Sequence, residues 1–308
     1  MSAALSTPPN RTARWARLLL WVVPALWSTN YLIARAADGV IGPHALAFGR
    51  WSLAALLLLP FTLRSLLRHK DALHREWKQS VVLGILGMWI CGAWLYHGGR
   101  QTSATNMALI YAVTPIAVAI VGTRLLHERM LPRQWFGAVL ALGGLLMVIA
   151  QGDLQRLVSV RFGAGDLWVV VAAASWVAYS VLLKHWRSAL GPAERLVATC
   201  AGGLAVMLPF TLFEAWSMPA PSPVPAALGL VVAAGVLPGV LSYASFSFLQ
   251  RELGAARTAL MLYLTPVYAP LLAWLLLGEA PRWYHAVGAA LILPSIALAT
   301  RAPAPSAR

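Results

Sequence analysis

Long apolar runs recur along the whole chain at intervals of roughly 25 to 30 residues, and they constrain the fold more than any other feature. An α-helix rises about 1.5 Å per residue, so each run is long enough to cross the roughly 30 Å hydrocarbon core of a bilayer. Only 11% of the residues are charged, whereas soluble domains carry about 25%. The sequence therefore predicts an all-α membrane protein rather than a water-soluble enzyme.

Windows of about 19 residues place ten transmembrane helices between two short tails, residues 1–17 and 301–308. The predicted helices are 18–34, 43–63, 80–97, 104–123, 134–150, 166–183, 194–213, 226–249, 257–277 and 283–300. The first run follows several arginines, as the apolar part of a signal peptide does. We keep it as a membrane span because it contains Asn30 and Tyr31 and has a counterpart in the second half of the chain.

Lys and Arg are unevenly distributed over the connectors between these helices. With the N-terminus inside, the inner tails and connectors carry 18 of the 24 basic residues, and the outer connectors carry 5. Cytoplasmic loops of membrane proteins have such an excess of basic residues. The sequence thus predicts that both termini are cytoplasmic. This topology accounts for the net charge of +14 without a nucleic-acid partner.

The two halves of the chain share matched residues at nearly constant offsets. At offsets of 149 and 151 residues, the matches include Gly42-Pro43 with Gly191-Pro192, Leu59–Leu63 with Leu208–Leu212, Thr114-Pro115 with Thr265-Pro266, and Glu128 with Glu279. Such matches indicate an internal duplication, with copies at 18–150 and 166–300. Because each copy holds five predicted helices, the second copy enters the bilayer inverted. Two inverted five-helix repeats are the architecture of many secondary transporters, whose solute site lies near the midplane.

Several short motifs add a family resemblance to this pattern. They are Pro24-Ala-Leu-Trp27-Ser-Thr-Asn30, Ala47-Phe48-Gly-Arg50, the two Thr-Pro pairs, and Glu128 and Glu279, each followed nine residues later by Gly137 or Gly288. In this order the motifs resemble the drug/metabolite transporter superfamily and its ten-helix EamA-type exporters, over nearly the whole chain. The resemblance implies export of amino acids or other small metabolites across a bacterial inner membrane. The tryptophan content is most similar to that of the aromatic amino acid exporters.

Prolines inside predicted helices mark candidate breaks. The hinge candidates are Pro24, Pro115, Pro238 and Pro266. A proline cannot donate its backbone hydrogen bond, so the carbonyls of Tyr111 and Leu262 lose their helix partner. Matched breaks in the two halves of a transporter supply polar groups and hinges near the solute site. The alternative is a tolerated kink whose carbonyl is satisfied by Thr114 or Thr265.

Polar and aromatic residues gather near the middle of the predicted spans. The candidates for the solute cavity are Trp27, Asn30, Tyr31, Arg50, Tyr96, His97, Tyr111, Thr114, Trp176, Tyr179, Tyr243, Tyr263 and Thr265. Aromatic walls with few hydrogen-bonding groups suit a flat, partly apolar solute of amino-acid size. The alternative is that the tryptophans only pack and that each hydroxyl bonds a neighbouring helix.

Arg50 is the one basic residue well inside a predicted span. A buried arginine in a membrane either pairs a substrate carboxylate or binds free backbone carbonyls at a helix break. All ten carboxylates lie in connectors or at the ends of predicted helices, so the sequence offers no carboxylate proton relay. His97 is a residue that can titrate near neutral pH. We therefore favour a facilitator or exchanger over a proton-coupled carrier.

Two other classes of protein remain as alternatives. An intramembrane enzyme needs a nucleophile, metal ligands or paired acids at membrane depth, and His127-Glu128 has no second histidine at the metalloprotease spacing. A non-transporting scaffold gives no reason for matched helix breaks. We therefore predict a non-enzymatic secondary transporter that exports its solute by alternating access. We expect it to use no cofactor or metal, and its expected partners are a small solute and lipid; no protein partner is evident.

Overall fold

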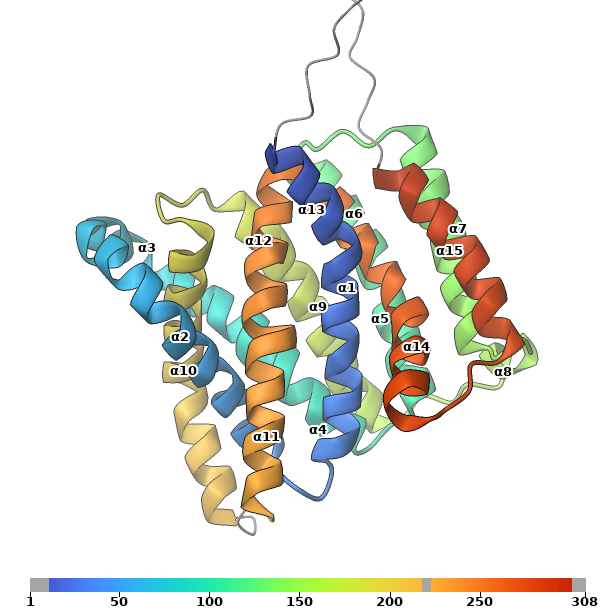
Figure 1. Ribbon diagram of the computed structural model, residues 1–308, viewed down its shortest axis with the longest axis horizontal. Helices are drawn as coiled ribbons and strands as arrows, with labels where there is room; N and C mark the ends of the chain where they lie inside the picture. The colour runs from blue at the N-terminus through green and yellow to red at the C-terminus, as the bar shows by residue number, and fades with distance from the viewer. Residues whose placement is uncertain (1–10, 218–222, 301–308) are drawn as a thin grey trace, which may run out of the picture.

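The computed structural model describes residues 11–217 and 223–300 (Figure 1). Both ranges are helical, and no β-strand occurs in them. The helices are α1 (Arg11–Ala37), α2 (Pro43–Arg68), α3 (Lys70–Gly84), the π-helix η1 (Ile85–Trp94), α4 (Leu95–Gly99), α5 (Ala104–Ala112), α6 (Thr114–Leu125), α7 (Pro132–Ile149), α8 (Gln155–Val158), α9 (Ala164–His185), α10 (Pro192–Ser217), α11 (Val224–Ala234), the π-helix η2 (Gly235–Leu241), α12 (Ser242–Leu253), α13 (Ala255–Leu260), the 3₁₀-helix η3 (Met261–Leu264), α14 (Thr265–Leu277) and α15 (Trp283–Thr300). The predicted all-α class is confirmed. The predicted tail 301–308 and residues 1–10 of the other tail lie outside the described ranges.

Eight helical stretches of the described residues are long and apolar enough to cross a membrane. They are Pro43–Arg68, Lys70–Gly99, Thr105–Leu125, Pro132–Ile149, Ala164–His185, Pro192–Ser217, Val224–Leu253 and Ala255–Leu276. The first and last predicted spans lie in α1 and α15 but are not among the eight. In α1, polar residues from Ser28 to Asn30 interrupt the apolar run, and the apolar part of α15, Trp283–Leu298, is shorter than the others. The ten-helix architecture therefore stays a prediction.

Prolines and glycines set several helix boundaries. Pro43 and Pro132 occupy the first positions of α2 and α7, where the missing N–H would have no helical acceptor. The side chain of Gln134 accepts a 2.8 Å hydrogen bond from the backbone N–H of Leu131 and caps α7. Gly278 ends α14 with φ of +72°, a conformation that glycine adopts without the steric cost of a Cβ. These local signals explain why the apolar runs end where they do.

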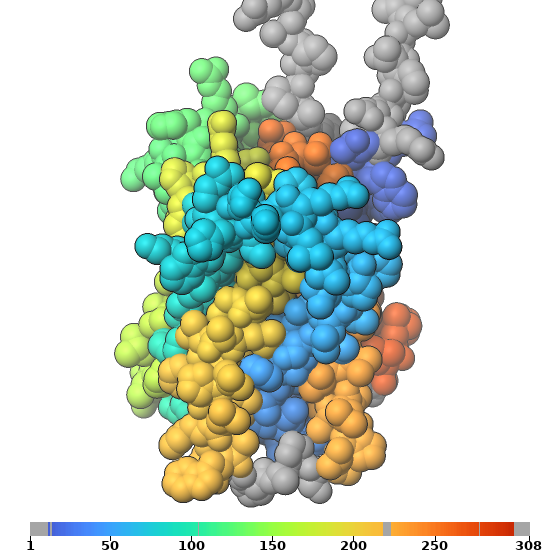
Figure 2. Space-filling view, turned by 90° about the vertical axis from the view of Figure 1, so that its left-hand side faces the viewer, coloured from blue at the N-terminus to red at the C-terminus, as the bar shows by residue number. Residues whose placement is uncertain are grey.

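The helices form one bundle whose two described termini lie at the same end (Figure 1). We call the end where α1 begins and α15 finishes the terminal end, and the other, where α8 lies, the opposite end. α7 packs along α15, α2 along α10, α6 along α13, η1 along α9, and α1 along α12. Figure 2 shows α2 and α10 side by side, with α3 above them toward the terminal end.

Helix packing inside the bundle depends on small residues. A Cβ placed on Gly84 of α3 would overlap the backbone of Gly203 of α10, so these two helices touch through their backbones. Such close contacts are common between membrane helices. On the outer surface, large apolar side chains face outward; Phe61 and Trp216 are 86% and 85% exposed. An exposed apolar surface of this kind fits a protein surrounded by lipid.

Candidate functional site

The two Thr-Pro pairs lie at breaks in the middle of long helical stretches. α5 ends just before Val113 and α6 follows it, while η3 separates α13 from α14. The Thr114 hydroxyl donates a 2.8 Å hydrogen bond to the Tyr111 carbonyl, and the Thr265 hydroxyl donates to the Leu262 carbonyl. Both carbonyls that the prolines deprive of a helix donor therefore have a local partner. Both helical stretches are therefore interrupted at the predicted positions, and the free carbonyl at each break accepts a hydrogen bond from the neighbouring threonine.

These two broken stretches cross one another at their breaks. The Tyr263 hydroxyl, fully buried, donates a 3.0 Å hydrogen bond to the carbonyl of Ala112, the last residue of α5. On the terminal side of this crossing, α6 packs along α13. On the other side, no comparable packing joins α5 to α14 within the described residues. The two broken stretches are therefore packed together on the terminal side of the crossing and apart on the other side. We call these the closed side and the separated side.

A carboxylate fixes the closed side. Glu128, in the connector after α6, accepts 2.8 Å hydrogen bonds from the backbone N–H groups of Ala255 and Ala256, where α13 begins. We call this contact the Glu128 latch. The preceding Gly254 has φ of +90°, and a Cβ there would press against the carboxylate. Glu279, the predicted counterpart of Glu128, instead accepts a 3.2 Å hydrogen bond from exposed Arg35.

Both π-helices leave backbone carbonyls that side chains of other helices bind. In η1, the Ser175 hydroxyl donates to the Leu86 carbonyl (2.7 Å) and the Tyr243 hydroxyl to the Gly87 carbonyl (3.1 Å). The Trp51 indole N–H donates to the next carbonyl, that of Met88, at 3.2 Å. A π-helix frequently marks a functional site because it disturbs the regular backbone ladder. η1 contains no proline, so no residue in the sequence marks it directly.

Arg50 lies at the second π-helix with two other predicted residues. The residue is 5% exposed; its Nη2 donates to the Pro238 carbonyl of η2 at 2.9 Å, and its Nη1 donates to Asn30 Oδ1 at 3.3 Å. The Tyr96 hydroxyl donates to the same Asn30 oxygen at 2.8 Å. Arg50 Nε is buried without a hydrogen-bond partner. We call Asn30, Arg50 and Tyr96 the polar triad.

Next to the polar triad, four predicted aromatic residues form one packed cluster. Trp27 and Trp176 have ring centroids 5.3 Å apart, and Tyr179 and Tyr243 pack beside them. Sequence analysis missed two further members, Trp51 and Phe246. Phe246 follows Tyr243 by three residues and so lies on the same helix face, while Trp51 adjoins Arg50 in sequence. Helical spacing could therefore have identified Phe246, and adjacency to Arg50 could have identified Trp51.

The remaining predicted residues do not join this group. His97 contacts Gln101 (3.2 Å) and the ring of Trp168 near the opposite end. The Tyr111 hydroxyl lies 3.8 Å from Cys91 Sγ. Pro24 lies inside α1, which continues through it without interruption. The thirteen predicted residues thus divide among the polar triad, the aromatic cluster, the crossing and separate positions.

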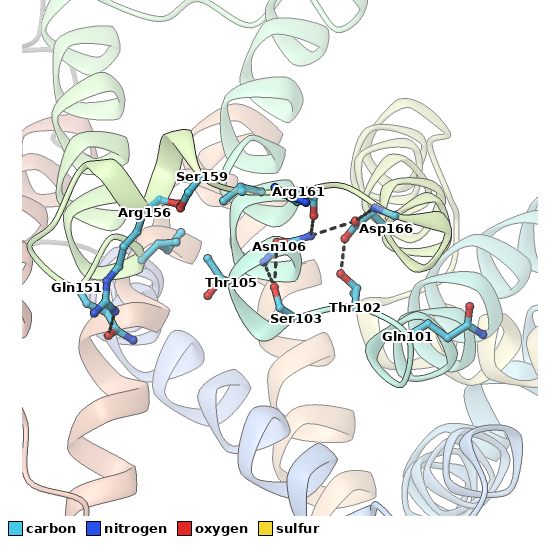
Figure 3. Close-up of a pocket in the computed structure, with 13 residues that line it drawn as sticks. Gln101, Thr102, Ser103, Thr105, Asn106, Gln151, Arg156, Ser159, Arg161 and Asp166 are labelled. Carbon is cyan, nitrogen blue, oxygen red and sulfur yellow. Dashed lines mark hydrogen bonds between the residues drawn. The ribbon is translucent and has the colours of Figure 1, made fainter.

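A hollow of about 430 Å³ lies at the opposite end, between the starts of α5 and α9 (Figure 3). Its polar groups bind one another: the Asn106 amide donates 3.0 Å hydrogen bonds to Asp166 and to the Arg161 carbonyl, and Thr102 donates to Asp166. This network caps the two helices, and none of the thirteen predicted residues lines the hollow. Among the residues that the structure describes, no three His, Cys, Asp or Glu side chains could hold a metal ion.

An all-helical bundle with eight candidate spans and broken helices at its centre defines a multi-pass membrane protein. The profile of the EamA-like transporter family matches this chain twice, over residues 14–150 and 163–301. The chain therefore belongs to the EamA-like transporter family.

Several relatives of this chain are named as transporters or exporters. A probable terminal-alkyne amino-acid exporter of Streptantibioticus cattleyicolor is 27% identical, covering 94% of this chain and 93% of the relative. A riboflavin transporter of Rhizobium johnstonii is 29% identical over 80% of this chain and 77% of its own length. An uncharacterized transporter of Bacillus subtilis, YyaM, is 25% identical over 88% of both chains. A crystal structure of a 21% identical protein matches with a TM-score of 0.75, covering 92% of this chain and 97% of that one, which supports the fold alone.

Proposed function

We propose that this protein is a secondary transporter that exports amino acids, or metabolites of similar size, by alternating access. One observation carries the proposal: two broken helical stretches cross at matched breaks, and they are packed on one side of the crossing and separated on the other. In the proposed cycle, the packed and separated sides exchange. Solute would then reach the centre of the bundle from one side at a time.

Helix packing supports the inverted repeat on which this cycle depends. α2 packs on α10 and α7 on α15, and each pair joins a helix to its predicted counterpart; α6 packs on α13, which joins the predicted span 104–123 to its counterpart 257–277. The contact of η1 with α9 likewise corresponds to the contacts of η2 and α12 with α1. A two-fold axis in the membrane plane produces this pattern, because it brings counterpart helices together and exchanges the other pairs. The two π-helices and the two breaks also fall at corresponding positions.

We place the terminal end in the cytoplasm of a bacterial cell, because the connectors that carry most of the Lys and Arg residues lie at that end. With this orientation, the crossing is closed toward the cytoplasm by the Glu128 latch and separated toward the outside. The structure then corresponds to the outward-open member of the proposed pair of conformations.

The proposed solute path runs between α1, η1 and α5. Tyr31 of α1 is 52% exposed, and Cys91 of η1 lies 3.8 Å from the hydroxyl of Tyr111 in α5. The polar triad and the aromatic cluster lie next to this region. Together they offer the few polar groups and large apolar walls typical of small-molecule sites.

Facilitated diffusion or exchange fits the acidic residues better than proton coupling. Among the described spans, carboxylates lie near helix ends, and one that is buried there, Glu214, already accepts hydrogen bonds from the backbone N–H groups of His44 and Ala45. A proton relay needs a carboxylate that is free to change its protonation at membrane depth. We therefore propose that the solute gradient, or an opposing solute, drives transport.

The test is counterflow into proteoliposomes loaded with unlabelled solute. Labelled phenylalanine, tryptophan, leucine and riboflavin are offered separately, with and without a pH gradient. We expect saturable uptake of at least one amino acid that does not depend on the pH gradient. Riboflavin uptake alone would favour the second candidate solute class, which the Rhizobium relative suggests. No uptake of any solute in either condition would contradict the proposed function.

A further inference from the structure

We propose that the polar triad is the recognition site for a carboxylate on the transported solute. This inference rests on the proposed function and names the chemical class of its substrate: a monocarboxylate with an apolar or aromatic body. The argument concerns the charge of Arg50, the neighbouring donors and the position of the site in the bundle.

The positive charge of Arg50 is buried against neutral acceptors only. Its two hydrogen bonds go to the Asn30 side-chain oxygen and to the Pro238 carbonyl, and its Nε has none. The ion pairs found elsewhere in the structure, such as Arg35 with Glu279, lie near helix ends. A buried cation without an anion is costly, and a bound carboxylate reduces that cost. A solute carboxylate would therefore gain binding energy from a charge that no ion pair among the described residues neutralises.

Binding a helix carbonyl does not by itself explain an arginine at this position. When the starts of the two π-helices, Ile85 and Gly235, are aligned, Pro238 of η2 corresponds to Met88 of η1, and the Met88 carbonyl is bound by the neutral indole of Trp51. A neutral donor thus satisfies the counterpart π-helix. At an offset of 149 residues, Arg50 itself corresponds to buried Thr199 of α10, so the second half has a neutral residue at the equivalent position.

The neighbouring groups suit a carboxylate attached to an apolar body. Arg50 and Tyr96 both donate to Asn30 Oδ1, and two carboxylate oxygens can accept from the same two donors. The guanidinium carbon lies 4.5 Å from the centre of the Trp51 ring and 5.8 Å from that of Tyr243. Tyr243 belongs to the aromatic cluster with Trp27. A solute held by its carboxylate would therefore place its side chain against aromatic rings.

The site lies on the separated side of the crossing. Arg50 is seven residues beyond Pro43, so it lies about 10 Å along α2 from its opposite end at 1.5 Å per residue. Tyr96, in α4, lies three residues before the end of the stretch Lys70–Gly99, which finishes at the opposite end of the bundle. On this side, no packing comparable to that of α6 on α13 joins α5 to α14 within the described residues.

The decisive experiment compares solutes that differ only in their carboxylate. Phenylalanine, tryptophan, leucine and their three amides are offered to the wild type and to Arg50→Gln, Arg50→Lys and Asn30→Asp. Binding is measured as the rise in unfolding temperature of the purified protein, and transport as counterflow in proteoliposomes. Asn30→Asp is the sharpest variant, because it places an internal carboxylate beside Arg50 with almost no change of shape.

We expect the acids, but not their amides, to raise the unfolding temperature of the wild type and to be transported by it. Arg50→Gln should weaken binding of the acids by tenfold or more, and Arg50→Lys should retain part of it because lysine keeps the charge without the planar fork. Asn30→Asp should abolish binding of the acids while its unfolding temperature in the absence of solute stays at or above that of the wild type. The matched control is Arg195→Gln. Arg195 binds the carbonyls of Leu183 and Trp186 near the terminal end of the bundle. This variant should leave the preference for acids unchanged.

Equal binding of acids and amides, or full counterflow of the acids by Asn30→Asp, overturns the carboxylate site while leaving transport intact. If the wild type binds the acids selectively but moves none of them, the site stands and the proposed function fails. If no solute stabilises the wild type or is transported by it, both the carboxylate site and the proposed function fail.

Discussion

The Glu128 latch offers a direct test of alternating access, because one substitution removes a contact that belongs to only one of the two proposed conformations. In Glu128→Gln, one backbone N–H keeps an oxygen acceptor while the other faces the side-chain NH₂ group. Hydrogen bonds to charged groups contribute about 1.5–3 kcal/mol each. Loss of one such bond, at about 2 kcal/mol, shifts a two-state equilibrium about 30-fold, since every 1.4 kcal/mol is a factor of ten.

The shift is measured as a distance change across the closed side. Spin labels at Leu125, at the end of α6, and at Arg251, near the end of α12, would report on separation of the connector from α13; both positions are exposed. Cys91 and Cys200, the two native cysteines, are replaced first. We expect double electron–electron resonance to show a longer-distance population, and we expect this population to be much larger in Glu128→Gln than in the wild type.

The matched control is Glu279→Gln. Glu279 pairs here with Arg35 while both side chains are at least half exposed, and exposed pairs contribute only about 0–1 kcal/mol. In the opposite conformation, the predicted repeat places Glu279 at the first backbone N–H groups of α5. Glu279→Gln should therefore lower the longer-distance population or leave it unchanged, and the double variant should return toward the wild type. Identical distance distributions in Glu128→Gln and the wild type, with both proteins folded by circular dichroism, would refute this account of the latch.

Three further predictions concern the crossing and the aromatic cluster. Trp27→Phe and Trp176→Phe, which keep a ring in the cluster, should lower counterflow severalfold while membrane insertion stays normal by immunoblot; wild-type flux in both variants would remove these residues from the solute path. Pro115→Ala and Pro266→Ala should change the maximal rate of counterflow more than its KM, because they act on helix geometry; unchanged rates would leave the prolines without a role in transport. Tyr263→Phe should cost about 0.5–1.5 kcal/mol of stability, measured by thermal unfolding with a solute-free sample, because it removes the hydrogen bond at the crossing; no change in unfolding temperature would show that this bond contributes little.

The helices and their breaks could be predicted from the sequence, whereas most contacts between the helices could not. Apolar runs and end signals such as Pro43 located the helices, since both act locally along the chain. The Thr-Pro repeats located the two breaks, because a proline removes a helix donor wherever it lies. In contrast, η1 has no such residue; its carbonyls are bound by side chains from α2, α9 and α12, and only the packed structure brings these together.

The candidate site divides in the same way. Arg50 was recognisable because an arginine inside an apolar span is unusual in any sequence. Its partners Asn30 and Tyr96 were among the predicted residues, but nothing in the sequence indicated that both bind a single oxygen atom. That the thirteen candidates line the solute cavity stays a prediction. Each hydroxyl satisfies whichever backbone carbonyl lies nearest, as Tyr243 does at η1 and Tyr263 at the crossing, and that choice depends on helix rotation.

The two halves differ at the positions that matter most for the proposed cycle. Gly254 precedes α13 and leaves room for the Glu128 carboxylate, whereas its counterpart Ser103 precedes α5 and caps that helix itself by accepting a 3.1 Å hydrogen bond from the Asn106 backbone N–H. The first turn of α5 therefore depends less on a distant carboxylate than the first turn of α13 does. An asymmetric pair of latches favours the conformation in which the stronger one is made, here the one closed toward the terminal end. A solute that binds the latch-open conformation more tightly than the latched one offsets the cost of opening the latch, whereas an empty carrier does not gain this energy, which favours exchange over the return of an empty carrier.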